Sequence, residues 1–409
     1  MSPKRSARAA GSHTWAFAPR FRRHAFGWKS EPAIQRIKEA VREIKTVARR
    51  DPVLAAEGAI RFLERLSPAL EHVDSSSGAI GTAVNRAIAE LVPIVAAAPA
   101  DATTRDAWLE RLFDAHAADE VPYIEQLAEH WGELCGSKEV ASAWADRLLG
   151  VTRMALSADK NLRGHFHGTS ACLTALYRAE RYDEIVDVLA AETFWHYKRW
   201  AVKALAALGK KAEAIRLAES SRGPWTSDAD VDALCEEMLL SSGLVEEAYA
   251  RYGLRMKRGG TYLAAFRTVA GKYPHKRPEE VLADLVAATP GEEGKWFATA
   301  KDLGLYDVAL ELVRTSPCDP KTLARAAREH AVTQPSFAVE AGYAALQWLA
   351  KGFGYEITGA DVWLAYSSAL QAAETLGRAP ETKERIRALA NERPSFVTEI
   401  LGRELGLLR

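Results

Sequence analysis

A short pattern recurs in the second half of this 409-residue sequence at intervals of 28 to 34 residues. In each copy a permissive or polar residue ends one helix, acids usually occupy the first turn of the next, and a small or β-branched residue lies five positions on. The copies are residues 180–185, 209–214, 243–248, 276–281 and 304–309, with a weaker sixth at 336–341. Repeats of this length are typical of helix pairs that bury their apolar faces only by stacking on their neighbours.

The rest of the chain has the same helical character. Ala, Leu, Glu, Arg and Lys dominate, whereas β-branched runs with period-two alternation are almost absent. The first strong helix follows Pro32, and Thr358 with Asp361 is typical of a helix start. Short breaks between about twenty helical segments force neighbours to run antiparallel. We therefore predict an all-α fold, an α-solenoid of stacked antiparallel helix pairs of TPR or HEAT type with no sheet.

The turns at residues 243–248 and 304–309 resemble the turn into the second helix of the tetratricopeptide-type repeat superfamily. The resemblance covers roughly residues 170–345 and implies an architecture in which the first helices of the repeats line a concave face. We expect residues 1–30 to form a basic, aromatic-containing tail or arm and residues 31–160 an irregular helical array. Residues 161–409 are expected to be TPR-like repeats with C-terminal capping helices.

The charge distribution, the spacing of the cysteines and the length of the apolar stretches indicate the class of protein and its location. The formal net charge is zero, yet residues 1–30 carry seven Lys or Arg and no acid, which leaves an excess of seven acids on the remainder. The four cysteines are widely spread with no CxxC pair, so reduced thiols in the cytoplasm are expected. The longest uncharged apolar stretch, residues 91–100, is too short to cross a membrane, so no membrane span is predicted.

Common catalytic signatures such as HExxH, GxSxG and the Walker loop are not found in the sequence. His165 and His167, followed by Cys172, offer three donors for zinc, but a His-x-His step suits a strand better than a helix and a fourth ligand is not evident. The small residues around Cys172 indicate a packed helix interior rather than a nucleophile. We predict no metal site and no cofactor.

The densest aromatic and basic segment of the helical body is residues 195–200. It is expected to open the first helix of a repeat, where Trp195, Tyr197, Lys198 and Arg199 would line a groove that grips an acidic or aromatic partner segment. The alternative is that the tryptophans pack between repeats and the charged residues are solvated.

The N-terminal segment interleaves basic and aromatic residues. Arg20, Arg22, Arg23, Phe26 and Trp28 have the composition needed to bind phosphates and stack on bases. Three alternatives remain open: a targeting segment, an arm that packs its aromatics along the acidic helical body, or disorder.

From these observations we predict a non-enzymatic scaffold that binds a protein or peptide through a groove of the helical array. The first alternative is a nucleic-acid-associated helical-repeat protein that uses the basic N-terminal arm. The second is an enzyme with a site that is not recognisable from sequence.

Overall fold

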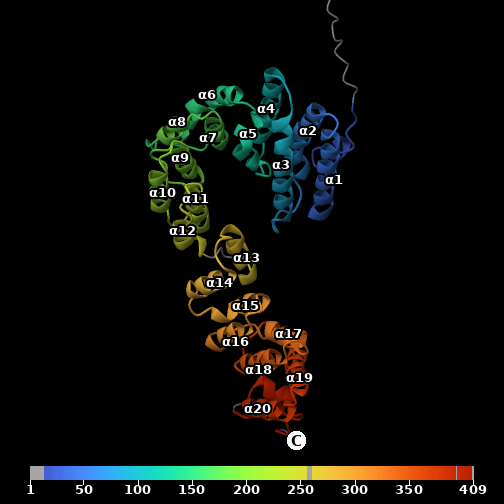
Figure 1. The fold of residues 1–409 in the computed structure, drawn as a ribbon. Helices are drawn as coiled ribbons and strands as arrows, with labels where there is room; N and C mark the ends of the chain where they lie inside the picture. The colour runs from blue at the N-terminus through green and yellow to red at the C-terminus, as the bar shows by residue number, and fades with distance from the viewer. Residues whose placement is uncertain (1–12, 256–259, 393, 408–409) are drawn as a thin grey trace, which may run out of the picture. The chain divides into compact units, whose positions relative to one another are not determined.

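The computed structural model describes residues 13–255, 260–392 and 394–407. Within these ranges the chain forms 21 α-helices joined by short turns, with a few 3-10 and π-helical segments and no strand (Figure 1). The predicted all-α fold is confirmed. The chain divides into two compact units, residues 1–231 and 232–409, and the boundary falls within α11 (Asp228–Leu240).

The first unit is built from helices that pack mainly on their neighbours in the chain. Its α-helices before α11 are α1 (Ser30–Ala48), α2 (Pro52–Leu70), α3 (Ala79–Ala97), α4 (Ala102–Ala117), α5 (Trp131–Leu134), α6 (Lys138–Ala155), α7 (Thr169–Arg178), α8 (Tyr182–Val188), α9 (Trp195–Ala207) and α10 (Lys211–Ser220). The 3-10 segments are η1 (Ala18–Arg20) and η2 (Glu125–His130). The segment η2 and the short helix α5 contact both α3 and α7, so they join the N-terminal helices of this unit to the later ones.

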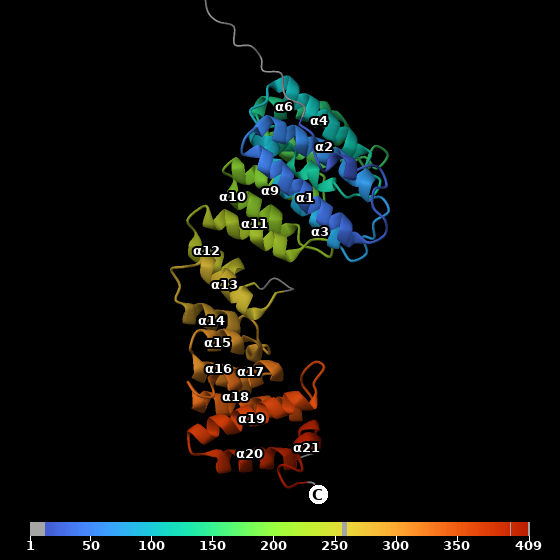
Figure 2. The same cartoon turned by 90° about the vertical axis from the view of Figure 1, so that its right-hand side faces the viewer.

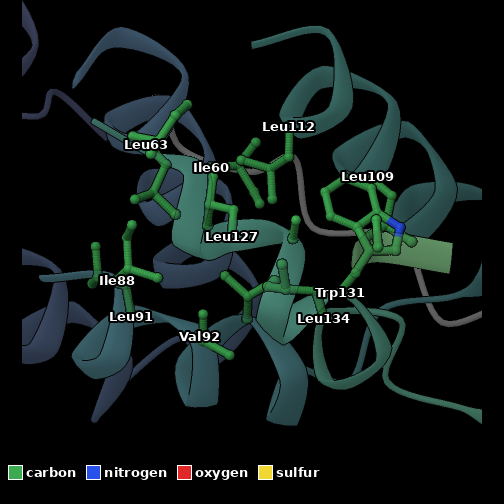
Figure 3. Packing of buried hydrophobic residues seen from close by; sticks show 14 of the residues in the cluster. Ile60, Leu63, Ile88, Leu91, Val92, Leu109, Leu112, Leu127, Trp131 and Leu134 are labelled. Atoms are coloured by element: carbon green, nitrogen blue, oxygen red, sulfur yellow. The ribbon is translucent and has the colours of Figure 1, made fainter. Parts of the chain in front are cut away.

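A continuous apolar core runs through the first unit. Figure 3 shows side chains of α2, α3 and α4 meeting η2 and α5, with the fully buried indole of Trp131 among them. Burying side chains of this size stabilises the fold by about 1.5–3 kcal/mol each relative to exposure. The helix α3 is the one described helix that is long and apolar enough to cross a membrane. Its apolar residues Ile88, Leu91 and Val92 lie in this core, as expected for a core helix.

The described part of the N-terminal arm, residues 13–29, packs on α1 and α2. Trp15, Phe17 and Phe21 are buried, and the rings of Phe17 and Phe21 contact Phe62 edge-on at 5.5 and 4.9 Å. Gly58 of α2 makes room for Trp15, because a Cβ atom there would lie only 2.2 Å from the indole. The arm is therefore part of the core, whereas the expectations for residues 1–12 lie outside the described residues.

Within the second unit, successive helices also pack on one another. After α11 come α12 (Val245–Ala248), α13 (Tyr262–Lys272), α14 (Pro278–Ala287), α15 (Phe297–Asp302), α16 (Tyr306–Thr315), α17 (Pro320–His330), α18 (Pro335–Ala350), α19 (Gly359–Thr375), α20 (Ala379–Glu392) and α21 (Phe396–Leu401). The π-helical turn η3 (Tyr249–Gly253) follows α12, and the 3-10 turn η4 (Glu293–Trp296) precedes α15. Figure 2 shows α14 to α20 stacked in chain order, and α17, α18 and α19 make the densest contacts of this unit.

The recurring turns adopt the geometry that their residues predict. Gly209, Gly243 and Gly304 have φ values of 80°, 75° and 76°, the left-handed conformation that ends a helix, and Glu180 adopts φ 60° at the matching position. The small or branched residue five positions on is fully buried in every copy: Ile185, Ala214, Ala248, Val281 and Ala309. The sequence register therefore identifies close contacts between helices.

Candidate functional site

A cleft of about 640 Å³ opens on the first unit where four segments of the chain meet. We call it the histidine cleft. It lies between the end of α4 with the loop after it, η2, the turn before α7, and the start of α9. The lining residues are His116, Asp119, Glu120, Pro122, Glu125, Gln126, Ala128, Glu129, His165, Phe166, His167, Ser170, Phe194, His196 and Tyr197.

Glu129 is the electrostatic centre of one wall. Its carboxylate lies 2.8 Å from Nε2 of His196 and accepts a hydrogen bond from Arg199, while the hydroxyl of Ser170 lies 3.3 Å from the same His196 nitrogen. Burial alone would raise the pKa of Glu129, but contacts with His196 and Arg199 outweigh it, so the pKa is lowered. A largely buried carboxylate on η2 therefore fixes the first turn of α9.

A second buried carboxylate sets the entry into α9. Glu192 is almost fully buried, accepts hydrogen bonds of 2.7 Å from the backbone N–H groups of Thr193 and Phe194, and pairs with Arg163 at 2.7 Å. These bonds hold Phe194 at the lip of the cleft with 52% of its surface exposed. Its ring lies 5.7 Å from the ring of Tyr197, so the two form an aromatic edge that solvent can reach.

Three histidines of the cleft lining lie close to one another. The rings of His165 and His167 lie 4.6 Å apart, and that of His167 lies 6.2 Å from His116. His116 is 8% exposed, its Nε2 atom has no hydrogen-bond partner within the described structure, and burial lowers its pKa. The ring is therefore neutral at pH 7, and its Nε2 atom is buried. Across the described ranges no three His, Cys, Asp or Glu side chains are arranged to hold a metal ion.

The turn that carries two of these histidines depends on Gly168. A Cβ atom at Gly168 would lie 2.5 Å from the ring of Phe166, so a larger residue would displace this ring from the cleft lining. Cys172, one turn further along α7, is fully buried, and burial raises the pKa of its thiol to about 11. It stays protonated at neutral pH, which disfavours a nucleophilic role.

The four residues that the sequence suggested for partner binding have different positions. Trp195 is buried at 6% exposure, and Lys198 is half-buried with no ion pair in the described structure. Arg199 is held by Glu129 and by the carbonyl oxygen of His196. Tyr197 alone of the four lines the cleft. The first turn of α9 thus contributes to a cleft, but mainly through other side chains.

The arm residues suggested for nucleic-acid contacts are largely engaged within the unit. Arg20 pairs with Glu39 at 3.0 Å and Arg23 with Glu71 at 3.5 Å. The guanidinium of Arg22 donates to the carbonyl of Pro19, and Phe26 packs on Phe21. Trp28 remains 71% exposed.

Sequence reasoning missed most of the cleft. Glu120 and Glu125 at its rim are exposed, and neither side chain has an ion-pair partner within the described ranges. Together with His116 and Phe194, they come from segments that no spacing rule connects. The one available signal was the clustering of polar and aromatic residues in the breaks before α7 and α9.

The sequence matches no protein-family model, and no curated protein is significantly similar to it.

Proposed function

We propose that the chain is a non-enzymatic scaffold with TPR-like repeats, which binds a protein or peptide partner in the histidine cleft. The observation that carries the proposal is that two exposed acids, Glu120 and Glu125, line the same cleft as the exposed ring of Phe194. The left-handed turns and the buried small residues of residues 180–309 support the TPR-like part. A cytoplasmic location is also proposed, since all four cysteines are free and buried.

The charges of the cleft favour a partner segment with a Lys or Arg side chain. Glu129 and Asp119 already have partners in the fold, so Glu120 and Glu125 are the carboxylates left for an incoming cation. An aliphatic stem would pack on Phe194 and Tyr197 while its charged head reaches the rim. This differs from the acidic segment expected from Lys198 and Arg199, because Glu129 occupies Arg199.

The test is a selection from a library of 12-residue peptides displayed on phage, using the full chain as bait. We expect enrichment of peptides with Lys or Arg next to an aromatic or aliphatic residue. The variant Glu120→Gln with Glu125→Gln should weaken the selected peptides by about tenfold or more, since two charge contacts are lost. Phe194→Ala should weaken them independently of salt.

The matched control is Asp114→Asn with Glu213→Gln, which removes the same charge at exposed acids outside the cleft. It should leave peptide affinity within about twofold. If the selection yields no peptide, or if the rim and control variants behave alike, the cleft is not the binding site that we propose.

A further inference from the structure

The first unit also has a positively charged surface, on α1. The contacts between the arm and α1 leave most of the cations of this helix exposed. Glu39 pairs with Arg20 of the arm at 3.0 Å and with Arg36 at 2.6 Å. Glu43 accepts hydrogen bonds from the backbone N–H groups of Ala16 at 2.8 Å and Phe17 at 3.2 Å. Glu39 and Glu43 therefore both lie on the side of α1 that contacts the arm.

The face of α1 toward α3 carries the cations. Lys38, Arg42, Lys45 and Arg49 follow one another at steps of four, three and four residues, which places them on one side of the helix. All four side chains are exposed, and with Arg86 of α3 they line a groove of about 350 Å³. We call it the α1–α3 groove.

Few acids compensate this charge. The one acidic residue that lines the groove is Glu90, which lies 3.0 Å from both Lys45 and Arg86. Lys38, Arg42 and Arg49 have no ion-pair partner within the described ranges. Five cations against one carboxylate leave a strong local positive charge at this groove.

We propose that the α1–α3 groove binds the phosphate backbone of a nucleic acid. Guanidinium groups hold phosphate oxygens with paired hydrogen bonds, and those of Arg42 and Arg49 have no ion-pair partner within the described ranges. The floor consists of Ile37, Val41, Ala83 and Ala87, of which Ile37, Val41 and Ala87 are already buried. A peptide partner would find no deep apolar pocket for an anchoring side chain there, whereas a phosphate backbone needs only the charges.

The length of the row of cations predicts how many phosphates the groove contacts. Residues 38 to 49 span about 16 Å at 1.5 Å per residue, a length over which one strand of a duplex presents about five phosphates. The groove offers five cations, of which two share Glu90, so three to five contacts are expected. The logarithm of the association constant should then fall with the logarithm of salt concentration with a slope of about −3 to −4.5. No aromatic residue lines the groove, so affinity should depend little on base sequence.

The experiment measures anisotropy of fluorescein-labelled 20-base-pair DNA, a 20-base-pair RNA duplex and a single-stranded 20-mer with the full chain at 50 to 200 mM salt. We expect binding of at least one probe, with the predicted slope for a duplex and a slope of about −2 to −3.5 for the single strand. The variant Arg42→Glu with Arg49→Glu should lower affinity at least tenfold, because it removes two contacts and adds repulsion. Both residues are exposed, and circular dichroism should show an unchanged helical melt.

The matched control is Lys160→Glu with Lys210→Glu, which makes the same change of net charge at two exposed lysines away from the groove. Its affinity should stay within about twofold of wild type. Absence of binding to all three probes, or equal losses in the groove and control variants, would overturn the proposal. So would competition by poly-glutamate as strong as by unlabelled nucleic acid, or stronger binding to vesicles containing phosphatidylserine. The residues of the histidine cleft are not altered, so this test is independent of the peptide selection.

Discussion

Replacing Glu129 with Gln removes one charge from the wall of the histidine cleft while keeping the shape of the side chain. The carboxylate is 13% exposed and holds His196 and Arg199 of α9. Arg199 is 31% exposed, so it loses its partner without becoming fully buried, and we expect a cost of roughly 1–3 kcal/mol. For a unit of about this size, each kcal/mol lowers the melting temperature by about 2–4 °C.

The pH dependence separates this electrostatic role from a packing role. The folded-state pKa of Glu129 is lowered from 4.5, so its stabilising charge is fully present above pH 4.5 and is lost as pH falls through the lower folded value. Melts of wild type and Glu129→Gln should therefore differ most from pH 5 to 8 and converge toward pH 3.5. Glu125→Gln, at an exposed carboxylate of the same cleft, serves as the control and should leave the melt unchanged. Equal melting temperatures at pH 7, or a difference that stays constant down to pH 3.5, would refute the reasoning.

Three further substitutions test the fold. Arg105→Met should cost about 2–4 kcal/mol in urea unfolding, because the buried guanidinium donates to the carbonyls at the end of α3, including that of Ala98 at 2.6 Å. Gly58→Ala, a change that normally stabilises a helix by about 1 kcal/mol, should instead destabilise the unit and expose Trp15, visible as a red shift of fluorescence. Glu180→Gly should raise the midpoint of thermal unfolding slightly, because it removes about 1 kcal/mol of backbone strain that the left-handed conformation imposes on Glu180. A lower midpoint would show that Glu180 carries no such strain.

Most of the helix starts and ends could be predicted from residues that are close together in the sequence. The left-handed turns at Gly209, Gly243 and Gly304 could be predicted because glycine ends helices at little steric cost. The helix start at Thr358 could be predicted because a capping box needs only residues three positions apart, and Thr358 and Asp361 form one. Such features depend on neighbours in the chain, so one sequence is sufficient to find them.

The candidate site could not be predicted in the same way, because its contacts join residues far apart in sequence. Glu129 and Arg199 are separated by 70 positions, and nothing in the 195–200 segment indicates that its arginine meets a buried carboxylate. Trp195 was indistinguishable from an exposed binding residue until its burial was known. The cleft is formed by four loop and helix-end segments, and each contributes only a few residues. Its lining residues therefore show no regular spacing in the sequence.

The N-terminal arm shows how the same charges can point to a different conclusion once their partners are known. In the sequence, seven cations without an acid suggested that the arm itself binds phosphates. In the structure, Arg20 of the arm pairs with Glu39 of α1, and the backbone N–H of Phe17 donates to Glu43, so the arm contacts two acids of this helix and compensates the charge of Glu39. Because like charges of Lys38 and Arg42 repel across one helical turn, leaving them unpaired costs stability and gains nothing for the fold itself. A bound anion would offset this cost, and for this reason we propose the phosphate site on α1.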